Sequence, residues 1–278
     1  MRHILIASFI FCGTLSSTEI DSFTLRDKTL KDGTAEMNAM MQRYLDSAVA
    51  KMNRAGSCDA KKFEDTLHGL TGGLAWSKVE GEIEHSTILD KRTLPRCESV
   101  YQDICLVDGV ALYLARLGFL MRFGNLYIGS DKFGHFIDQG FDYYRSFSLE
   151  DGMRFGEMTE RTYYGLMTTA VYSYGDLSAN LDGYQFWSSL AKGDDPYFTC
   201  QNNKWTQVKR FDWMDYANAA WDEGLNCSFY RNEEVTEQVH ARIKKAGFTC
   251  PVDKSYCPEM IRHYGYLAPR VISQACFY

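Results

Sequence analysis

The chain has 278 residues, 45% of them hydrophobic and 24% charged, so it is long enough to bury one large core or the cores of two lobes. Its formal charge of −6 disfavours nucleic acids and anionic membranes as partners. An acidic protein of this kind suits a neutral glycan, or a glycan whose unmasked amino groups carry positive charge.

The first residues predict an export signal. A basic Arg2 precedes an apolar run over residues 4–11, and the small residues Ser16 and Ser17 follow. This pattern is typical of a secretory signal peptide, residues 1–17, and the apolar run is too short for a permanent anchor. We therefore expect a secreted or periplasmic monomer without a stable membrane anchor, with residues 18–278 forming a single two-lobed domain.

Cysteine usage agrees with export. Removing the leader with Cys12 leaves eight of the nine cysteines, and an even number in an exported chain indicates disulfides. None of the eight has the Cys-x-x-Cys spacing of a zinc knuckle. Half of them lie from Cys227 onward, which predicts a disulfide-rich C-terminal part over residues 200–278 with the pairing left open.

Apolar periodicity and capping residues predict a mostly α fold with a helical N-terminal part over residues 34–125. The predicted elements of this part are a helix over 34–53 that ends before Gly56, a short helix over 63–70 that ends at Gly72, loop with one or two short strands over 74–97, and a central buried helix over 107–121.

A catalytic core is expected over residues 129–190. Ser130 and Ser148 are positioned to cap two successive helices, the second of which should end at Gly165. Beyond it, β-type residues and turn signals predict a strand pair that folds back. After a polar loop over 192–203, a helix starting at Asp212 and another over 233–246 complete the prediction.

The candidate catalytic residues follow from this layout. Glu160 falls in the last turn of its helix, where the helix dipole and the nearby tyrosines raise the pKa of a carboxyl and suit it to act as a general acid. Asp176, brought across by the strand pair, would be the second carboxylate that glycoside hydrolysis requires. Glu157, one turn before Glu160, is the alternative acid. The alternative for Glu160 is a surface residue paired to Arg161.

Aromatic and amide side chains in the same segment predict sugar binding, because tyrosine offers a flat apolar face and a hydroxyl. The predicted substrate-binding residues are Tyr164, Tyr172, Tyr174, Asn180, Tyr184 and Trp187. The alternative is that Asp176 forms a turn and that Asn180 caps a helix, which these residue types often do.

The segment from Gly156 to Trp187 resembles the lysozyme superfamily. A glutamate that ends a helix precedes a β-hairpin and a second polar residue, and the run Gly165-Leu166-Met167 is similar to the run after the catalytic glutamate of the goose-type and transglycosylase branches. The resemblance implies an α+β lysozyme-like fold and cleavage of a GlcNAc-containing wall polysaccharide, including deacetylated peptidoglycan. No cofactor and no metal is required.

Two further hypotheses stay open. Asp131, His135 and Asp138 share one face of the preceding helix, which would suit a metal-dependent hydrolase. The same face can instead be polar surface, with His135 held by a neighbouring aspartate, or can line the site of Glu160. The other hypothesis is a non-catalytic protein that binds glycan or protein through its tyrosines.

Overall fold

Helices and small antiparallel sheets make up the computed structural model, which describes residues 19–73 and 77–278. The predicted leader, residues 1–17, lies outside the described part. The helices are α1 (Thr34–Ala55), α2 (Ala60–Thr71), α3 (Lys78–His85), α4 (Val110–Leu114), α5 (Ser130–Arg145), α6 (Leu149–Arg161), α7 (Tyr174–Ser189), α8 (Glu233–Lys245), α9 (Cys257–Tyr264) and α10 (Ala268–Val271). The strands are β1 (Lys91–Arg92), β2 (Leu120–Phe123), β3 (Leu126–Gly129), β4 (Val171–Tyr172), β5 (Phe198–Gln201), β6 (Lys204–Gln207) and β7 (Phe229–Tyr230). The predicted mostly α class is confirmed.

Several helices form where local signals predict them. α1 ends at Gly56, whose φ of 59° is the left-handed conformation that glycine adopts readily. α6 begins at the side chain of Ser148, which accepts a hydrogen bond from the backbone N–H of Asp151. α8 is capped in the same way by Asn232. Glu160 lies in the last turn of α6, as expected.

The predicted central helix over residues 107–121 is wrong. Only α4 is helical there, and β2 pairs with β3 in a hairpin closed by Gly124 and Asn125. Gly124 has a φ of 55°, which suits the turn. The apolar residues of α4 do not all point inward, because Leu114 is 62% exposed and Val110 is 45% exposed.

The strand pair predicted after Gly165 does not form within that segment. Val171 and Tyr172 make a strand, but its partner is β7, which lies far along the chain. The residues expected to fold back form α7, which starts at Ser173. Asp176 is therefore in the first turn of a helix and not in a β-turn.

Other segments differ from expectation as well. Residues 78–85 form α3 where a loop was predicted, and the predicted polar loop contains β5, which pairs with β6 just beyond the loop. The helix expected from Asp212 is replaced by two single 3-10 turns, Trp213–Asp215 and Ala219–Trp221. The tryptophans of both turns are still buried in the core. The apolar pattern therefore predicted which side chains are buried, but not the backbone conformation.

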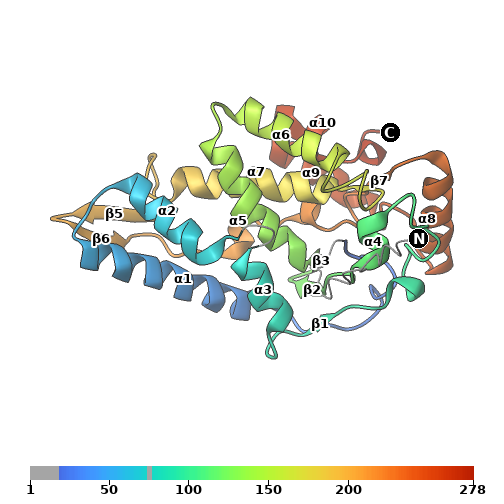
Figure 1. Ribbon diagram of the computed structural model, residues 1–278, viewed down its shortest axis with the longest axis horizontal. Helices are drawn as coiled ribbons and strands as arrows, with labels where there is room; N and C mark the ends of the chain where they lie inside the picture. The colour runs from blue at the N-terminus through green and yellow to red at the C-terminus, as the bar shows by residue number, and fades with distance from the viewer. Residues whose placement is uncertain (1–18, 74–76) are drawn as a thin grey trace, which may run out of the picture.

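The helices α5 and α7 cross at the centre of the molecule, with α1, α2 and the β5–β6 hairpin at one end and α8 at the other (Figure 1). The crossing is close because glycines meet there: a Cβ on Gly140 would lie 2.6 Å from the Cα of Gly183. The main apolar core joins these two helices to α1 and α2. A smaller apolar cluster lies under α8.

Disulfides join Cys58 to Cys200, Cys227 to Cys250 and Cys257 to Cys276. The expected C-terminal disulfides are therefore present. Cys97 and Cys105 are free and exposed, so the expectation that all the remaining cysteines pair is wrong in this structure. Among the described helices, none has both the length and the apolar character that crossing a bilayer requires.

Candidate functional site

Glu160 lies buried at the C-terminal end of α6, with only 3% of its surface exposed. The backbone N–H of Ser173 donates a hydrogen bond to its Oε2 over 3.2 Å. Burial, reinforced by the negative charge of Asp176, raises the pKa of Glu160 well above its usual value. These surroundings therefore favour the protonated form of this carboxyl.

Asp176 occupies the first turn of α7, where its backbone N–H donates to the Ser173 hydroxyl over 3.1 Å. Its Oδ1 lies 2.5 Å from the Lys132 ammonium, and its Oδ2 lies 3.2 Å from Nε2 of His135. Burial opposes ionisation, but the charges of His135 and Lys132 outweigh it and hold the pKa of Asp176 below its usual value. This carboxyl is therefore ionised beside the protonated Glu160.

Lys132 is completely buried in the first turn of α5. Besides Asp176, its Nζ contacts Asp131 at 2.7 Å and Glu223 at 2.8 Å. Burial by itself lowers the pKa of an ammonium, but these carboxylates raise that of Lys132 well above its usual value. The lysine is a permanent buried cation.

Two further buried carboxyls complete the group. Glu223 accepts a hydrogen bond from the Ser173 hydroxyl over 2.6 Å, and burial raises its pKa to about 7 although Lys132 partly offsets the effect. Its Oε2 has no partner among the described residues. Burial, together with the charges of Glu223 and Asp176, raises the pKa of Glu19 well above its usual value. We call Glu19, Asp131, Lys132, His135, Glu160, Ser173, Asp176 and Glu223 the buried polar centre.

Asn180, one turn along α7 from Asp176, places its side-chain amide against Nδ1 of His135. With the amide turned so that Nδ2 faces the imidazole, Nδ2 donates to Nδ1 of His135 over 3.1 Å and to the carbonyl of Asp176 over 3.1 Å. In the opposite orientation Oδ1 of Asn180 lies 3.1 Å from Nδ1 of His135 and bonds to it only if Nδ1 carries the proton. In both orientations Nε2 of His135 faces Oδ2 of Asp176.

The structure brings some predicted site residues together and separates others. One side-chain atom each of His135, Glu160 and Asp176 lies within 4.8 Å of the other two. Glu157 is turned away and pairs with Arg270 of α10.

The predicted metal triad on α5 is not assembled. Asp131 and His135 belong to the buried polar centre, whereas Asp138 pairs with His68 over 3.0 Å and accepts from the backbone N–H of Gly73 over 3.2 Å. The different grouping of His135, Glu160 and Asp176 has the geometry to offer a metal ion three ligands. The second candidate grouping, Asp131 with Asp176 and Glu223, surrounds the Lys132 ammonium.

The predicted sugar-binding aromatics differ in accessibility. Trp187 is fully buried and donates from Nε1 to the carbonyl of Ile137 over 3.1 Å, and the buried Tyr172 stacks on Phe229 at 4.3 Å between ring centroids. Neither ring presents a free face. Tyr164 is 44% exposed beside Tyr163, and the remaining predicted tyrosines, Tyr174 and Tyr184, are half-buried.

The sequence analysis missed Lys132, Ser173, Glu19 and Glu223. One signal was available: Lys132 is a cation in the first turn of a helix, where the dipole disfavours positive charge, so its position requires a compensating partner. Nothing local marks Glu223, because it reaches the centre from a loop beyond the two 3-10 turns.

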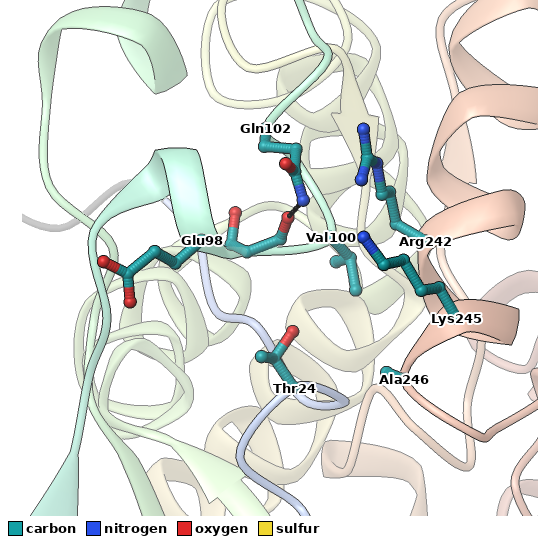
Figure 2. A pocket seen from close by; sticks show the side chains of 8 residues that line it. Thr24, Glu98, Val100, Gln102, Arg242, Lys245 and Ala246 are labelled. Carbon is teal, nitrogen blue, oxygen red and sulfur yellow. Dashed lines mark hydrogen bonds between the residues drawn. The ribbon is translucent and has the colours of Figure 1, made fainter.

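A hollow of about 210 Å³ lies at the surface between the loop before α4 and the end of α8 (Figure 2). Arg242 and Lys245 line it, together with Gln102 and Thr24. Arg242 is already engaged by Asp103, whose carboxylate it contacts through Nε and Nη2. The hollow shares no lining residue with the buried polar centre. We assign the candidate chemistry to the centre, because the buried carboxyls gather there.

Comparisons with protein-family models, with curated proteins and with solved structures found no match.

Proposed function

We propose that this chain is a secreted glycoside hydrolase that cleaves a GlcNAc-containing wall polysaccharide, with Glu160 as general acid and Asp176 as the second carboxylate. One observation carries the proposal: two neighbouring buried carboxyls have environments that move their pKa values in opposite directions. Such a pair supplies one proton donor and one ionised base or nucleophile at the same pH.

The geometry supports a particular role for Asp176. An oxygen of Glu160 and an oxygen of Asp176 lie within 4.8 Å of each other, closer than the spacing of roughly 6.5–9.5 Å at which inverting glycosidases admit a water molecule between the carboxyls, which favours a retaining arrangement. Asp176 would then attack the sugar carbon while Glu160 protonates the leaving oxygen. Solvent reaches this edge, since the side chains of His135 and Asp176 are 16% and 12% exposed.

Substrate binding would use the accessible tyrosines, with Tyr164 nearest to solvent and Tyr174 and Tyr184 partly covered. The negative charge of the chain fits a neutral or deacetylated glycan better than ordinary anionic peptidoglycan. The three disulfides fit an oxidising compartment outside the cytoplasm and support export.

The test is digestion of native and deacetylated peptidoglycan by purified protein, with mass spectrometry of the soluble products. We expect Glu160→Gln to lower the rate by about 10²–10⁴-fold, because a neutral amide cannot donate the proton. Glu36→Gln, on the exposed face of α1, serves as a matched control and should digest normally.

Other outcomes would redirect the assignment. If Glu157→Gln abolishes digestion and Glu160→Gln does not, the acid is Glu157. If the protein binds the polymer and releases no fragments, it is a non-catalytic binding protein.

A metal-dependent hydrolase is the second candidate, favoured by the 3.2 Å between Nε2 of His135 and Oδ2 of Asp176 with Glu160 nearby. A metal on Nε2 would require the proton to sit on Nδ1, and the better-bonded orientation of Asn180 places an N–H donor against Nδ1. This observation favours acid–base chemistry. Elemental analysis showing one stoichiometric divalent metal, with activity lost in EDTA and restored by that metal, would favour the second candidate instead.

A further inference from the structure

The buried polar centre contains five carboxyls and one lysine. The ammonium of Lys132 contacts Asp131, Asp176 and Glu223 within 2.8 Å, whereas Glu160 and Glu19 are not among its ion-pair partners. One buried cation therefore divides the carboxyls into a contacted group and a group that it does not touch.

A glycine in α7, Gly175, leaves room for the side chain of Lys132. A Cβ on Gly175 would lie 2.8 Å from Cε of Lys132 and 3.2 Å from Cγ of Glu223, so any larger residue would occupy the space of the lysine stem. Gly175 directly precedes Asp176 in α7, and the ammonium contacts Oδ1 of Asp176 while His135 faces Oδ2.

We propose that Lys132 is the positioning residue of the centre: it holds Oδ1 of Asp176, keeps that carboxylate ionised, turns Oδ2 towards His135, and leaves Glu160 as the carboxyl that retains its proton. This role rests on the proposed acid–base function, but its ionisation part can be measured without substrate.

The charges around each carboxyl account for the difference between Asp176 and the other acids of the centre. Asp176 faces two positive or proton-donating groups, Lys132 and His135, and it is the one carboxyl of the centre whose pKa is lowered. Asp131 also touches the lysine, yet burial outweighs that contact and raises its pKa. The groups that face Asp176 from the packed elements are Glu19, Asp131, Lys132, His135, Glu160 and Glu223. Without the ammonium, Asp176 would keep only His135 against the four neighbouring acids, and its pKa should rise.

The experiment is an NMR titration of protein labelled with ¹³C at the aspartate carboxyls, with the Asp176 signal assigned by its loss in Asp176→Asn. In Lys132→Met, which keeps the length of the stem and removes the charge, we expect the Asp176 midpoint to rise by about 1–3 pH units. Lys61→Met, which removes an exposed lysine paired with Asp65, is the control and should leave the midpoint unchanged. An unchanged midpoint in Lys132→Met would overturn the proposal.

If Lys132→Met does not fold because it leaves buried carboxylates without their cation, a second variant keeps the proposal testable. Lys132→Met combined with Glu223→Gln removes one positive and one negative charge together, and the Asp176 midpoint should still rise in it. In the wild-type protein, a midpoint at or above that of an exposed aspartate would overturn the proposal without any variant.

Activity separates this proposal from the proposed function. If the wild-type protein digests no wall polymer while the Asp176 midpoint moves as expected, the glycosidase proposal fails and the positioning of Asp176 stands. If digestion is confirmed, Lys132→Met should lower kcat more than it changes KM, and the acid limb of its pH profile should move to higher pH with the Asp176 midpoint.

Discussion

Glu160 and Asp176 bear the same functional group, and their neighbours give them opposite protonation states. Glu160 has one backbone donor and lies among acids, so burial dominates and the proton stays. Asp176 has Lys132 on one oxygen and His135 on the other, so opposite charge dominates and the proton leaves. Both residues are more than nine-tenths buried, so differences in contacts and not in exposure set their ionisation.

These directions predict the pH dependence of digestion. Activity should decline as the pH rises through the raised pKa of Glu160, because the acid loses its proton, and should decline at low pH only below the usual range of an aspartate, where Asp176 gains one. The profile of kcat/KM should therefore have a plateau that extends well into the acidic range.

The measurement is a series of initial rates on a suspended wall polymer at constant ionic strength. A profile that instead rises steeply near pH 7 would contradict the assignment of Asp176. It would point to Glu223, whose pKa is raised to about 7, as the group that must be ionised.

At the scale of elements, the crossing of α5 over α7 creates the centre. The crossing sets His135 of α5 against the first turns of α7, where Ser173 and Asp176 lie. A Cβ on Gly183 would lie 2.1 Å from the carbonyl oxygen of Phe136, so the approach depends on glycine at this position. The helices could not come as near with larger residues there.

We therefore expect Gly183→Ala to destabilise the fold by about 1–3 kcal/mol, because the added methyl group forces the two backbones apart. Gly69→Ala is the matched control: Gly69 is also within a helix, α2, and a Cβ there meets nothing within 4 Å. That variant should be more stable by about 0.5–1 kcal/mol, since alanine is the better helix former. Urea unfolding followed by circular dichroism measures the free energy of unfolding of both variants. Equal changes in Gly183→Ala and Gly69→Ala would contradict the role of the crossing.

At the scale of the whole molecule, the disulfides join segments that are far apart along the chain. Cys58, just after α1, is bonded to Cys200 in β5 across a separation of 142 residues, whereas Cys257 and Cys276 are separated by 19. The first bond closes a loop that contains α5, α6 and α7. It therefore restricts the unfolded chain most.

Chain-entropy arguments predict a loss of about 5 kcal/mol when both Cys58 and Cys200 are replaced by alanine, against about 3 kcal/mol for Cys257 and Cys276. Replacing the free Cys97 and Cys105 by serine should leave stability almost unchanged and serves as the control. Thermal unfolding under non-reducing conditions gives the ranking. A greater loss from the shorter loop would show that native packing around Cys257, which is buried, outweighs the entropy of the unfolded chain.

Local signals along the sequence were sufficient for features set by neighbouring residues. The caps at Ser148 and Asn232, the glycine after α1 and the position of Glu160 at the end of α6 depend on contacts within a few residues, so they were predictable. The apolar run over 107–121 was misread, because a buried strand and a buried helix segment share the same composition.

Tertiary structure decided the rest. The strand partner of Val171 and Tyr172, the burial of Trp187 and the pairing of the cysteines each depend on residues distant in sequence. The sequence alone indicated Glu160 as the carboxyl that keeps its proton and Asp176 as its partner, but not that Lys132, on a different helix, contacts Asp176. The physical reason is that desolvation and charge act through space over a few ångströms, and only the folded chain determines which groups come that close.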